Sequence, residues 1–154
     1  MQIERISINS PHYPGACALR QEVLLDEIEY TIERFRSEYP GVEEAFEHFV
    51  AIDDKLAGDR NGVVGVVCLH PKLDATPREG KLMQMAVDDV CRGRGVGRLL
   101  VDALMDRATG LGLDRVYCHA RLDACGFYER LGWTYDSDLF MEAGIEHRRM
   151  VAPS

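Results

Sequence analysis

The strongest constraint on the fold lies in residues 82–104, where an apolar run is followed by glycines and then by an amphipathic segment. Residues 82–87 (Leu-Met-Gln-Met-Ala-Val) have the length and apolar character of a buried strand. Residues 92–97 (Arg-Gly-Arg-Gly-Val-Gly) form a glycine-rich turn, and residues 96–104 keep helical spacing. The order strand, glycine-rich turn, helix presents unpaired backbone N–H groups at the positive end of a helix, where a pyrophosphate can bind.

The glycine-rich turn matches neither of two common nucleotide-binding fingerprints. Gly93, Gly95 and Gly97 alternate, and Arg98 occupies the third-glycine position of G-x-G-x-x-G. A G-x-x-x-x-G-K-[ST] sequence is missing as well. The residues alone therefore leave two interpretations open: a phosphate-binding turn, and an exposed helix entry with solvated arginines.

Length and composition favour one soluble domain covering residues 1–154. With 46% hydrophobic and 29% charged residues, the chain is long enough to bury a single core. Its apolar runs are all shorter than the roughly 20 residues of a membrane helix, and residues 1–5 lack the apolar character of a signal peptide. We therefore expect a cytoplasmic protein that does not bind membranes.

Charge and cysteine content exclude two further classes of function. A net charge of −8 disfavours nucleic-acid binding, which needs clustered Lys and Arg, and is compatible with a cationic acceptor. The five cysteines are odd in number and widely spaced, which argues against a disulfide framework. Cys118, His119 and Cys125 fit no standard zinc spacing, so no metal is expected.

The hydrophobic pattern predicts an α/β fold. The strand 82–87 and the strand 115–120 are separated by a helix and should be parallel, through a right-handed crossover. His70-Pro71 should end the strand before residue 82, and Asn61-Gly62 favours a tight reversal in the loop 53–62. The expected strands cover 2–8, 46–52, 63–69, 82–87, 115–120, 133–135 and 145–151, and the expected helices cover 11–26, 29–38, 96–111 and 124–131.

Two segments resemble the GCN5-related N-acetyltransferases (GNAT). Arg92, Gly95 and Gly97 occupy the three defined positions of the family's acyl-CoA-binding motif, Arg/Gln-x-x-Gly-x-Gly/Ala. Residues 126–133 (Gly-Phe-Tyr-Glu-Arg-Leu-Gly-Trp) are similar to its Phe-Tyr-x-x-Leu-Gly-Phe signature, with Trp133 at the last position. The resemblance covers essentially the whole chain and implies a GNAT fold: a mixed twisted sheet of six to seven strands with about four helices.

The resemblance also implies where acetyl-CoA binds. Backbone N–H groups of residues 93–98 and the helix dipole would hold the pyrophosphate, and arginines would add charge-assisted bonds. The strand end at 85–87 would pair with the pantetheine arm, and one of its N–H groups would stabilise the oxyanion. The cofactor-binding residues so implied are Met85, Ala86, Val87, Arg92, Gly93, Arg94, Gly95, Val96, Gly97, Arg98, Arg121, Ala124 and Phe127.

Three positions around the second motif carry specific expectations. Tyr128 takes the place of the family's tyrosine that protonates the departing CoA thiolate, although packing of a short amphipathic helix also explains Phe127 and Tyr128. Arg121 stands where the family often has an Asn that contacts the cofactor, so it either meets a phosphate or caps the strand end. Ala124 keeps the family's small residue.

The general base is the least determined residue. His119 and His70, each at a predicted strand end, are candidates because histidine titrates near neutrality, and Glu27 is a third. A structural role is the alternative for each. Residues 142–150 are similar to a phrase in the ElaA-like branch of these acetyltransferases, which puts His147 on the last strand.

We therefore expect an enzyme that transfers acetyl from acetyl-CoA to a primary amine by direct attack in a ternary complex. A small amine or polyamine is slightly favoured over a protein acceptor, and a homodimer is compatible with the family. The alternative is a non-catalytic acyl-CoA-binding or sensing module on the same scaffold, since one fold hosts many functions. A ping-pong route through Cys118 or Cys125 lacks a recognisable activating base.

Overall fold

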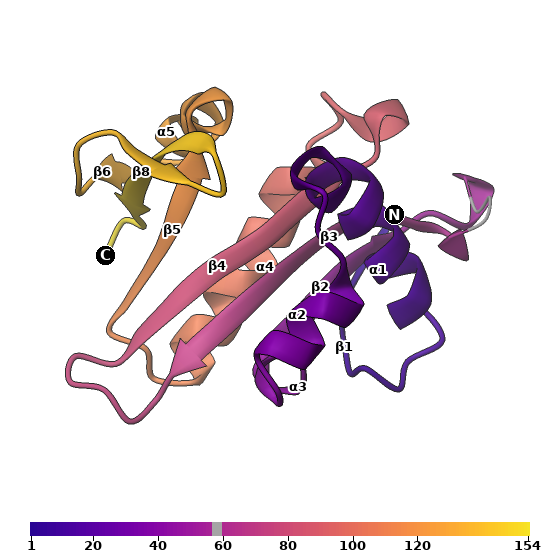
Figure 1. Ribbon diagram of the computed structural model, residues 1–154, viewed down its shortest axis with the longest axis horizontal. Coiled ribbons are helices and arrows are strands. Elements are labelled where there is room, and N and C mark those ends of the chain that lie inside the picture. Colours follow the sequence, from indigo (N-terminus) through magenta and orange to yellow (C-terminus); the bar gives the residue numbers. More distant parts are fainter. Residues whose placement is uncertain (57–59) are drawn as a thin grey trace.

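The computed structural model describes residues 1–56 and 60–154 and contains one mixed sheet (Figure 1). Strand order is β1-β2-β3-β4-β5-β8-β6, and β7 pairs with β8. The strands in this part of the chain are β1 (Gln2–Ile6), β2 (Glu47–Ile52), β3 (Val63–Lys72), β4 (Glu79–Val87), β5 (Arg115–Arg121), β6 (Thr134–Tyr135), β7 (Phe140–Glu142) and β8 (Ile145–Val151). Its α-helices are α1 (Tyr13–Arg20), α2 (Ile32–Glu38), α3 (Val42–Ala45), α4 (Val96–Gly110) and α5 (Cys125–Arg130).

The topology confirms the predicted α/β fold. Strands β1 to β4 form an antiparallel meander, and β4 pairs in parallel with β5 after the α4 crossover. Helices α1 and α2 lie on one face of the sheet and α4 on the other (Figure 1). The layered arrangement buries one apolar cluster under α4 and a second under α1.

The helix α4 packs closely on β3 because of a glycine. Its buried side chains include Val96 and Leu100, which recur at the spacing of one helix face. A Cβ atom on Gly65 would lie 2.8 Å from Val96 and 2.9 Å from Leu100. A side chain at this position would push the helix off the sheet, so Gly65 sets the depth at which α4 begins.

A bulge in β4 reverses which face its side chains occupy. The strand gains one residue relative to β3 between Met83 and Ala86, and Gln84 takes a left-handed φ of 56°. Leu82 therefore packs in the cluster under α4, whereas Ala86 packs in the cluster under α1. In a regular strand, residues 82 and 86 would share a face.

A buried polar network ties the bulge to three other elements. Glu43 of α3 accepts hydrogen bonds from Arg20 (2.5 and 3.2 Å) and from the Tyr13 hydroxyl (2.6 Å). The Nε of Arg20 donates to the Gln84 side chain at 3.3 Å, and His48 of β2 lies 2.9 Å from the Glu43 carbonyl. Arg20 and Glu43 are 2% and 0% exposed, so each charge depends on the other for its solvation.

Acid is expected to weaken this network. Burial by itself raises the pKa of Glu43, but the hydrogen bonds and charge of Arg20 outweigh it and hold that pKa below the usual value. A lowered folded-state pKa contributes stability above the ordinary glutamate pKa of about 4.3, and this contribution disappears as pH falls toward the folded value. Denaturant unfolding at pH 7 and pH 3.5 should show a steeper loss of unfolding free energy for the wild type than for Glu43→Gln. Equal losses would contradict the role of Glu43.

Several predicted boundaries were wrong for physical reasons. The sheet has eight strands and not six to seven within residues 1–56 and 60–154, because the short β7 was not expected, and this part of the chain holds five α-helices in place of about four. Strand β3 continues through Pro71 to Lys72. At Pro71 the strand pairs with β4 and no longer with β2, so proline's missing N–H breaks no hydrogen bond to β2. The expected helix 11–26 ends at Arg20 and continues as a π-helical turn over Gln21–Leu25 and a 3₁₀ turn over Asp26–Ile28.

Of the loop 53–62, residues 57–59 lie outside the described residues. Its Asn61-Gly62 reversal is confirmed: both residues have positive φ, and the N–H of Asp53 donates to the Gly62 carbonyl at 2.8 Å. None of the helices in the described ranges has the length and apolar character needed to cross a membrane.

Candidate functional site

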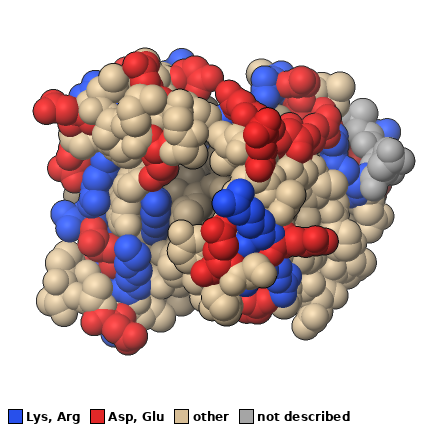
Figure 2. Space-filling model, viewed as in Figure 1, with Lys and Arg blue, Asp and Glu red and all other residues tan. Residues whose placement is uncertain are grey.

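Strands β4 and β5 part in the middle of the sheet. They pair only between Glu79–Leu82 and Arg115–Cys118, although β4 continues to Val87 and β5 to Arg121. In the described structure, the edge of residues 83–87 that faces β5 therefore has no strand partner, which leaves a backbone edge able to pair with an extended ligand. Figure 1 shows the two strands diverging, and Figure 2 shows this face hollowed between the part formed by β5 and β8 and the part formed by α1 and α2.

The glycine-rich turn leads directly from β4 to an uncapped helix end. Gly93 and Gly95 have φ values of 79° and 78°, and a Cβ atom on either would meet no atom within 4 Å. Gly95 is the N-cap of α4 and offers no side-chain bond; the first intrahelical bond runs from the Leu99 N–H to the Gly95 carbonyl at 3.1 Å. The N–H groups of residues 96–98 are thus available at the positive end of a 15-residue helix.

The arginines of this turn differ in their partners. Arg92 forms an ion pair with Asp89 at 2.9 Å. Arg94 and Arg98 are exposed, and neither forms an ion pair within residues 1–56 and 60–154. Two guanidinium groups therefore stand free beside the uncapped helix end, in a chain whose net charge is −8.

Helix α5 packs its aromatic residues against the first turn of α4. A Cβ atom on Gly97 would lie 3.1 Å from the Phe127 ring, so only glycine admits this contact without displacement. The Phe127 and Tyr128 rings meet edge to face at 5.0 Å, and Tyr128 lies 5.1 Å from Trp133. The two motifs predicted from sequence, the glycine-rich turn and residues 126–133, are therefore in contact. Ala124 precedes this helix as its N-cap.

Tyr128 has the properties of a protonated donor. The residue is 4% exposed, and its hydroxyl forms no hydrogen bond with any described residue. Burial raises the pKa of Tyr128 well above its ordinary value, and Cys118 and Cys125 raise it further. The hydroxyl therefore keeps its proton at neutral pH and has that proton free to donate.

His119 is the first residue of β5 beyond the point where β4 and β5 part. Its Nδ1 lies 2.9 Å from Oε1 of Glu142, and its side chain is 25% exposed. Burial lowers the pKa of His119, the hydrogen bond to Glu142 raises it, and Lys81 and Arg149 lower it, with a net decrease. His119 is therefore a neutral imidazole near pH 7, which is the form of a general base.

The structure places the other two candidate bases differently. His70 pairs across the sheet with Lys81, and its ring meets Phe46 edge to face at 5.2 Å. Burial, then Lys72 and Lys81, lower the pKa of His70. Glu27 forms an ion pair with Arg121 at 2.5 Å, so neither group is free.

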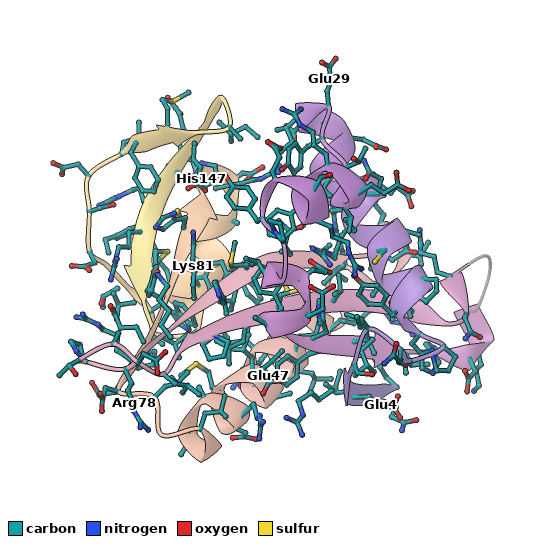
Figure 3. All side chains as sticks on the ribbon, turned by 60° about the horizontal axis from the view of Figure 1, so that its bottom comes forward. Glu4, Glu29, Glu47, Arg78, Lys81 and His147 are labelled. Atoms are coloured by element: carbon teal, nitrogen blue, oxygen red, sulfur yellow. The ribbon has the colours of Figure 1, made fainter. Side chains whose placement is uncertain are left out.

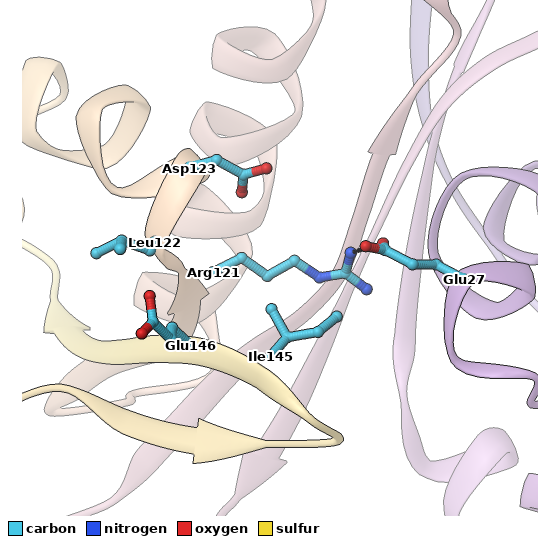
Figure 4. Close-up of a pocket in the computed structure, with 6 residues that line it drawn as sticks. All are labelled: Glu27, Arg121, Leu122, Asp123, Ile145 and Glu146. Carbon is cyan, nitrogen blue, oxygen red and sulfur yellow. Dashed lines mark hydrogen bonds and ion pairs between the residues drawn. The ribbon is translucent and has the colours of Figure 1, made fainter.

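A pocket of about 350 Å³ opens beside this ion pair (Figure 4). Arg121, at the end of β5, reaches across it to Glu27 and also donates to the Leu24 carbonyl at 3.1 Å. The salt bridge between Arg121 and Glu27 thus joins the end of β5 to the segment that follows α1, at one end of the parted strands. The pocket is lined by Glu27, Arg121, Leu122, Asp123, Ile145 and Glu146.

Sequence reasoning missed two residues of this region. Glu142 lies on β7, and the turn that joins β7 to β8 is Ala143-Gly144, which lacks the usual Asn-Gly or Asp-Gly signal. Gln84 adopts its left-handed conformation at the bulge without a glycine to mark it. Within the described ranges, no three His, Cys, Asp or Glu side chains are grouped as metal ligands.

The chain belongs to the acetyltransferase (GNAT) family, whose model matches residues 17–133. A Bacillus subtilis (strain 168) protein whose name assigns it to the acetyltransferases is 37% identical over 72 residues, 47% of this chain and about half, 49%, of that relative. Escherichia coli ElaA superimposes with a TM-score of 0.77 at 17% identity, covering 99% of this chain and 100% of that chain. An aminoglycoside 6'-N-acetyltransferase in complex with coenzyme A gives a TM-score of 0.73 at 16% identity, covering 98% and 96%. These structural likenesses support the GNAT fold.

Proposed function

We propose that this protein is an acetyl-CoA-dependent N-acetyltransferase that acts by direct attack of a primary amine in a ternary complex. One observation carries the proposal: β4 parts from β5 before it ends, and its end leads through residues 88–95 to the uncapped start of α4, where Arg94 and Arg98 are exposed. The unpaired edge of β4 would hold the extended pantetheine arm of the cofactor, and the helix end that follows it would hold the pyrophosphate. Membership of the family supports the same conclusion.

We propose the following cofactor contacts, which the positions of these groups support. Within the predicted range 93–98, the pyrophosphate would accept bonds from the N–H groups of residues 96–98 and from the side chains of Arg94 and Arg98, with Arg92 adding charge nearby. The pantetheine arm would lie along Met85–Val87, where one N–H group would stabilise the oxyanion. The Phe127 ring would form part of the wall of the cofactor site. A contact from Arg121 stays a prediction, because Glu27 already holds that side chain.

The proposed reaction uses one acid and one base. His119 would accept the proton that the attacking ammonium must lose, and the amine nitrogen would then form a bond to the thioester carbonyl carbon. As the carbon–sulfur bond breaks, Tyr128 would donate its proton to the departing sulfur. Tyr128 and Cys118 share the apolar cluster under α4, whereas His119, the next residue of β5, projects from the other face of that strand.

The buried cysteines support direct attack over a thiol-bound intermediate. Burial raises the pKa of Cys118 to about 12 and also raises that of Cys125. Neither residue therefore supplies a thiolate at neutral pH, which a ping-pong route requires. A small amine or polyamine remains the proposed acceptor. A homodimer, a single domain over residues 1–154, a cytoplasmic location and the ElaA-like branch stay predictions.

The proposal is tested by incubating the protein with acetyl-CoA and a panel of amines, and by following release of the CoA thiol and acetylated product. We expect amine-dependent turnover with at least one small amine or polyamine. Selective binding of acetyl-CoA without turnover on any amine or peptide acceptor would favour the alternative, a non-catalytic acyl-CoA-binding module.

The free arginines give a prediction about affinity. Each charge-assisted bond to a phosphate contributes about 1.5–3 kcal/mol, or about 10- to 100-fold in affinity, so replacing both Arg94 and Arg98 by Ala should weaken CoA binding by about 100-fold or more. Arg78→Ala is the matched control: this exposed arginine precedes β4, at the opposite end of that strand from the start of α4 (Figure 3). Calorimetry on the three proteins checks the difference. Equal affinity in all of them would contradict the pyrophosphate site.

A further inference from the structure

The hairpin formed by β7 and β8 brings a carboxylate to the proposed base. Strand β8 pairs with β5 through residues 147–151, with His119 opposite Arg149, and its first residues pair with β7. The hairpin lies across the end of β5, so that Glu142 of β7 reaches His119 at 2.9 Å. The β7–β8 hairpin thus contributes to the surroundings of His119, which lies where β4 and β5 part.

The carboxylate of Glu142 is held between two imidazole rings. Its Oε1 accepts from Nδ1 of His119, and its Oε2 lies 3.7 Å from Nε2 of His147. The second ring is fixed in turn, because Nδ1 of His147 lies 2.7 Å from the Ile145 carbonyl and the residue is 6% exposed. Phe140 packs against both rings, at 5.1 Å from His119 and 5.9 Å from His147. The Glu142 side chain is 45% exposed, and its hydrogen bond to His119 is the contact that orients its carboxylate.

This arrangement selects one tautomer of His119. A carboxylate accepts hydrogen bonds and does not donate them, so Nδ1 of His119 carries the proton. Its Nε2 then bears the lone pair, and this atom forms no hydrogen bond with a described residue. The ring is therefore oriented with its proton-accepting atom free, as the base of an acid–base reaction requires.

The charges around the ring oppose one another. Lys81 on β4 and Arg149 on β8 lower the pKa of His119, Glu142 on β7 raises it, and Tyr117 on β5 lies 5.9 Å away, ring to ring. Lys81 on β4 and His147 on β8, both labelled in Figure 3, belong to the two strands that flank β5. Glu142 thus offsets two cations and keeps His119 basic enough to accept a proton.

We propose that Glu142 is a positioning residue for the base His119, and that the β7–β8 hairpin is therefore part of the catalytic apparatus. This inference rests on the proposed acetyltransferase function, in which His119 removes the proton of the acceptor amine. Glu142 itself touches neither the acceptor nor the thioester. It acts by fixing the tautomer and orientation of the imidazole.

The first test reads the imidazole directly and needs no substrate. Nitrogen-15 NMR of the histidine rings, with the His119 signal identified by its loss in His119→Gln, should show the Nδ1–H tautomer in the wild type. In Glu142→Gln the tautomers should mix, and the pKa of His119 should fall because a favourable negative charge is gone. Asp138→Asn is the matched control, since Asp138 is an exposed carboxylate just before β7. An unchanged tautomer and pKa in Glu142→Gln would overturn the proposal.

The second test measures turnover with the amine that the panel identifies. Glu142→Gln should lower kcat about 10- to 100-fold, part of the effect of a general base, and should move the acidic limb of the pH profile to lower pH. His119→Gln should lower kcat at least as far, and Asp138→Asn should match the wild type. Full activity of Glu142→Gln, while His119→Gln is inactive, would overturn the positioning role alone. A wild type without turnover on any acceptor would instead count against the acetyltransferase function, whatever the NMR result.

Discussion

Replacing Tyr128 by Phe is expected to lower kcat at least 100-fold while the affinity for acetyl-CoA changes less than about 3-fold. A positioned general acid contributes about 10²–10⁴ to a rate, and the thiolate that leaves would lose its proton donor. The substitution removes one hydroxyl that forms no hydrogen bond with a described residue, so the fold should keep its stability. Steady-state kinetics and calorimetry on the same preparation separate these effects.

Tyr135→Phe is the matched control for this prediction. Tyr135 lies on the exposed strand β6, away from the parted strands, and its hydroxyl donates a hydrogen bond to Glu129. We expect turnover within about 2-fold of the wild type, because an exposed hydrogen bond of this kind contributes little. If Tyr128→Phe retained full turnover, the packing role of Phe127 and Tyr128 would be the better interpretation, and the proton would have to come from another group.

Replacing Glu43 by Gln should lower the free energy of unfolding by about 3–5 kcal/mol, because it leaves the buried guanidinium of Arg20 without its counter-charge. Both side chains are almost fully buried, and Arg20 also holds Gln84 at the bulge of β4. The loss would be a large part of the 5–15 kcal/mol that typically stabilises a domain. Urea titration at pH 7, followed by circular dichroism, measures it.

Two further variants define the cause of this loss. Glu44 is the adjacent carboxylate, but it pairs with Arg36 on the surface, where the side chains are 42% and 40% exposed. Glu44→Gln should therefore cost less than about 1 kcal/mol. The double variant Arg20→Met with Glu43→Leu should lose less than the sum of the two single variants, since it removes both charges together. Additive losses would show that the two residues do not stabilise the fold as a pair.

Local patterns in the sequence predicted the strand, the glycine-rich turn and the helix that surround the candidate site. Residues 82–104 combine a strand, glycines at positive φ and an amphipathic helix, and each of these is specified by neighbouring residues. The contact between the two motifs follows from the fold that they define. Gly97 shows the limit of this reasoning, because only the structure reveals that its missing side chain makes room for Phe127.

Interactions between distant segments could not be predicted in the same way. The ion pair of Arg121 with Glu27 joins residues 94 positions apart, and the bond from His119 to Glu142 crosses from β5 to a three-residue strand. Neither leaves a periodic signal in the sequence. The bulge at Gln84 was not predicted for a related reason, since Arg20, which bonds to its side chain, lies far away in the sequence on helix α1.

The central claim is that the parted strands and the start of α4 form an acetyl-CoA site, and isothermal titration calorimetry tests it most directly. The wild-type protein should be titrated with acetyl-CoA, with CoA and with NAD as comparisons. We predict micromolar binding of acetyl-CoA and CoA, weakened in the Arg94→Ala and Arg98→Ala double variant, and no binding of NAD. Failure of both CoA species to bind would contradict the acetyltransferase assignment and leave the family's fold serving another purpose.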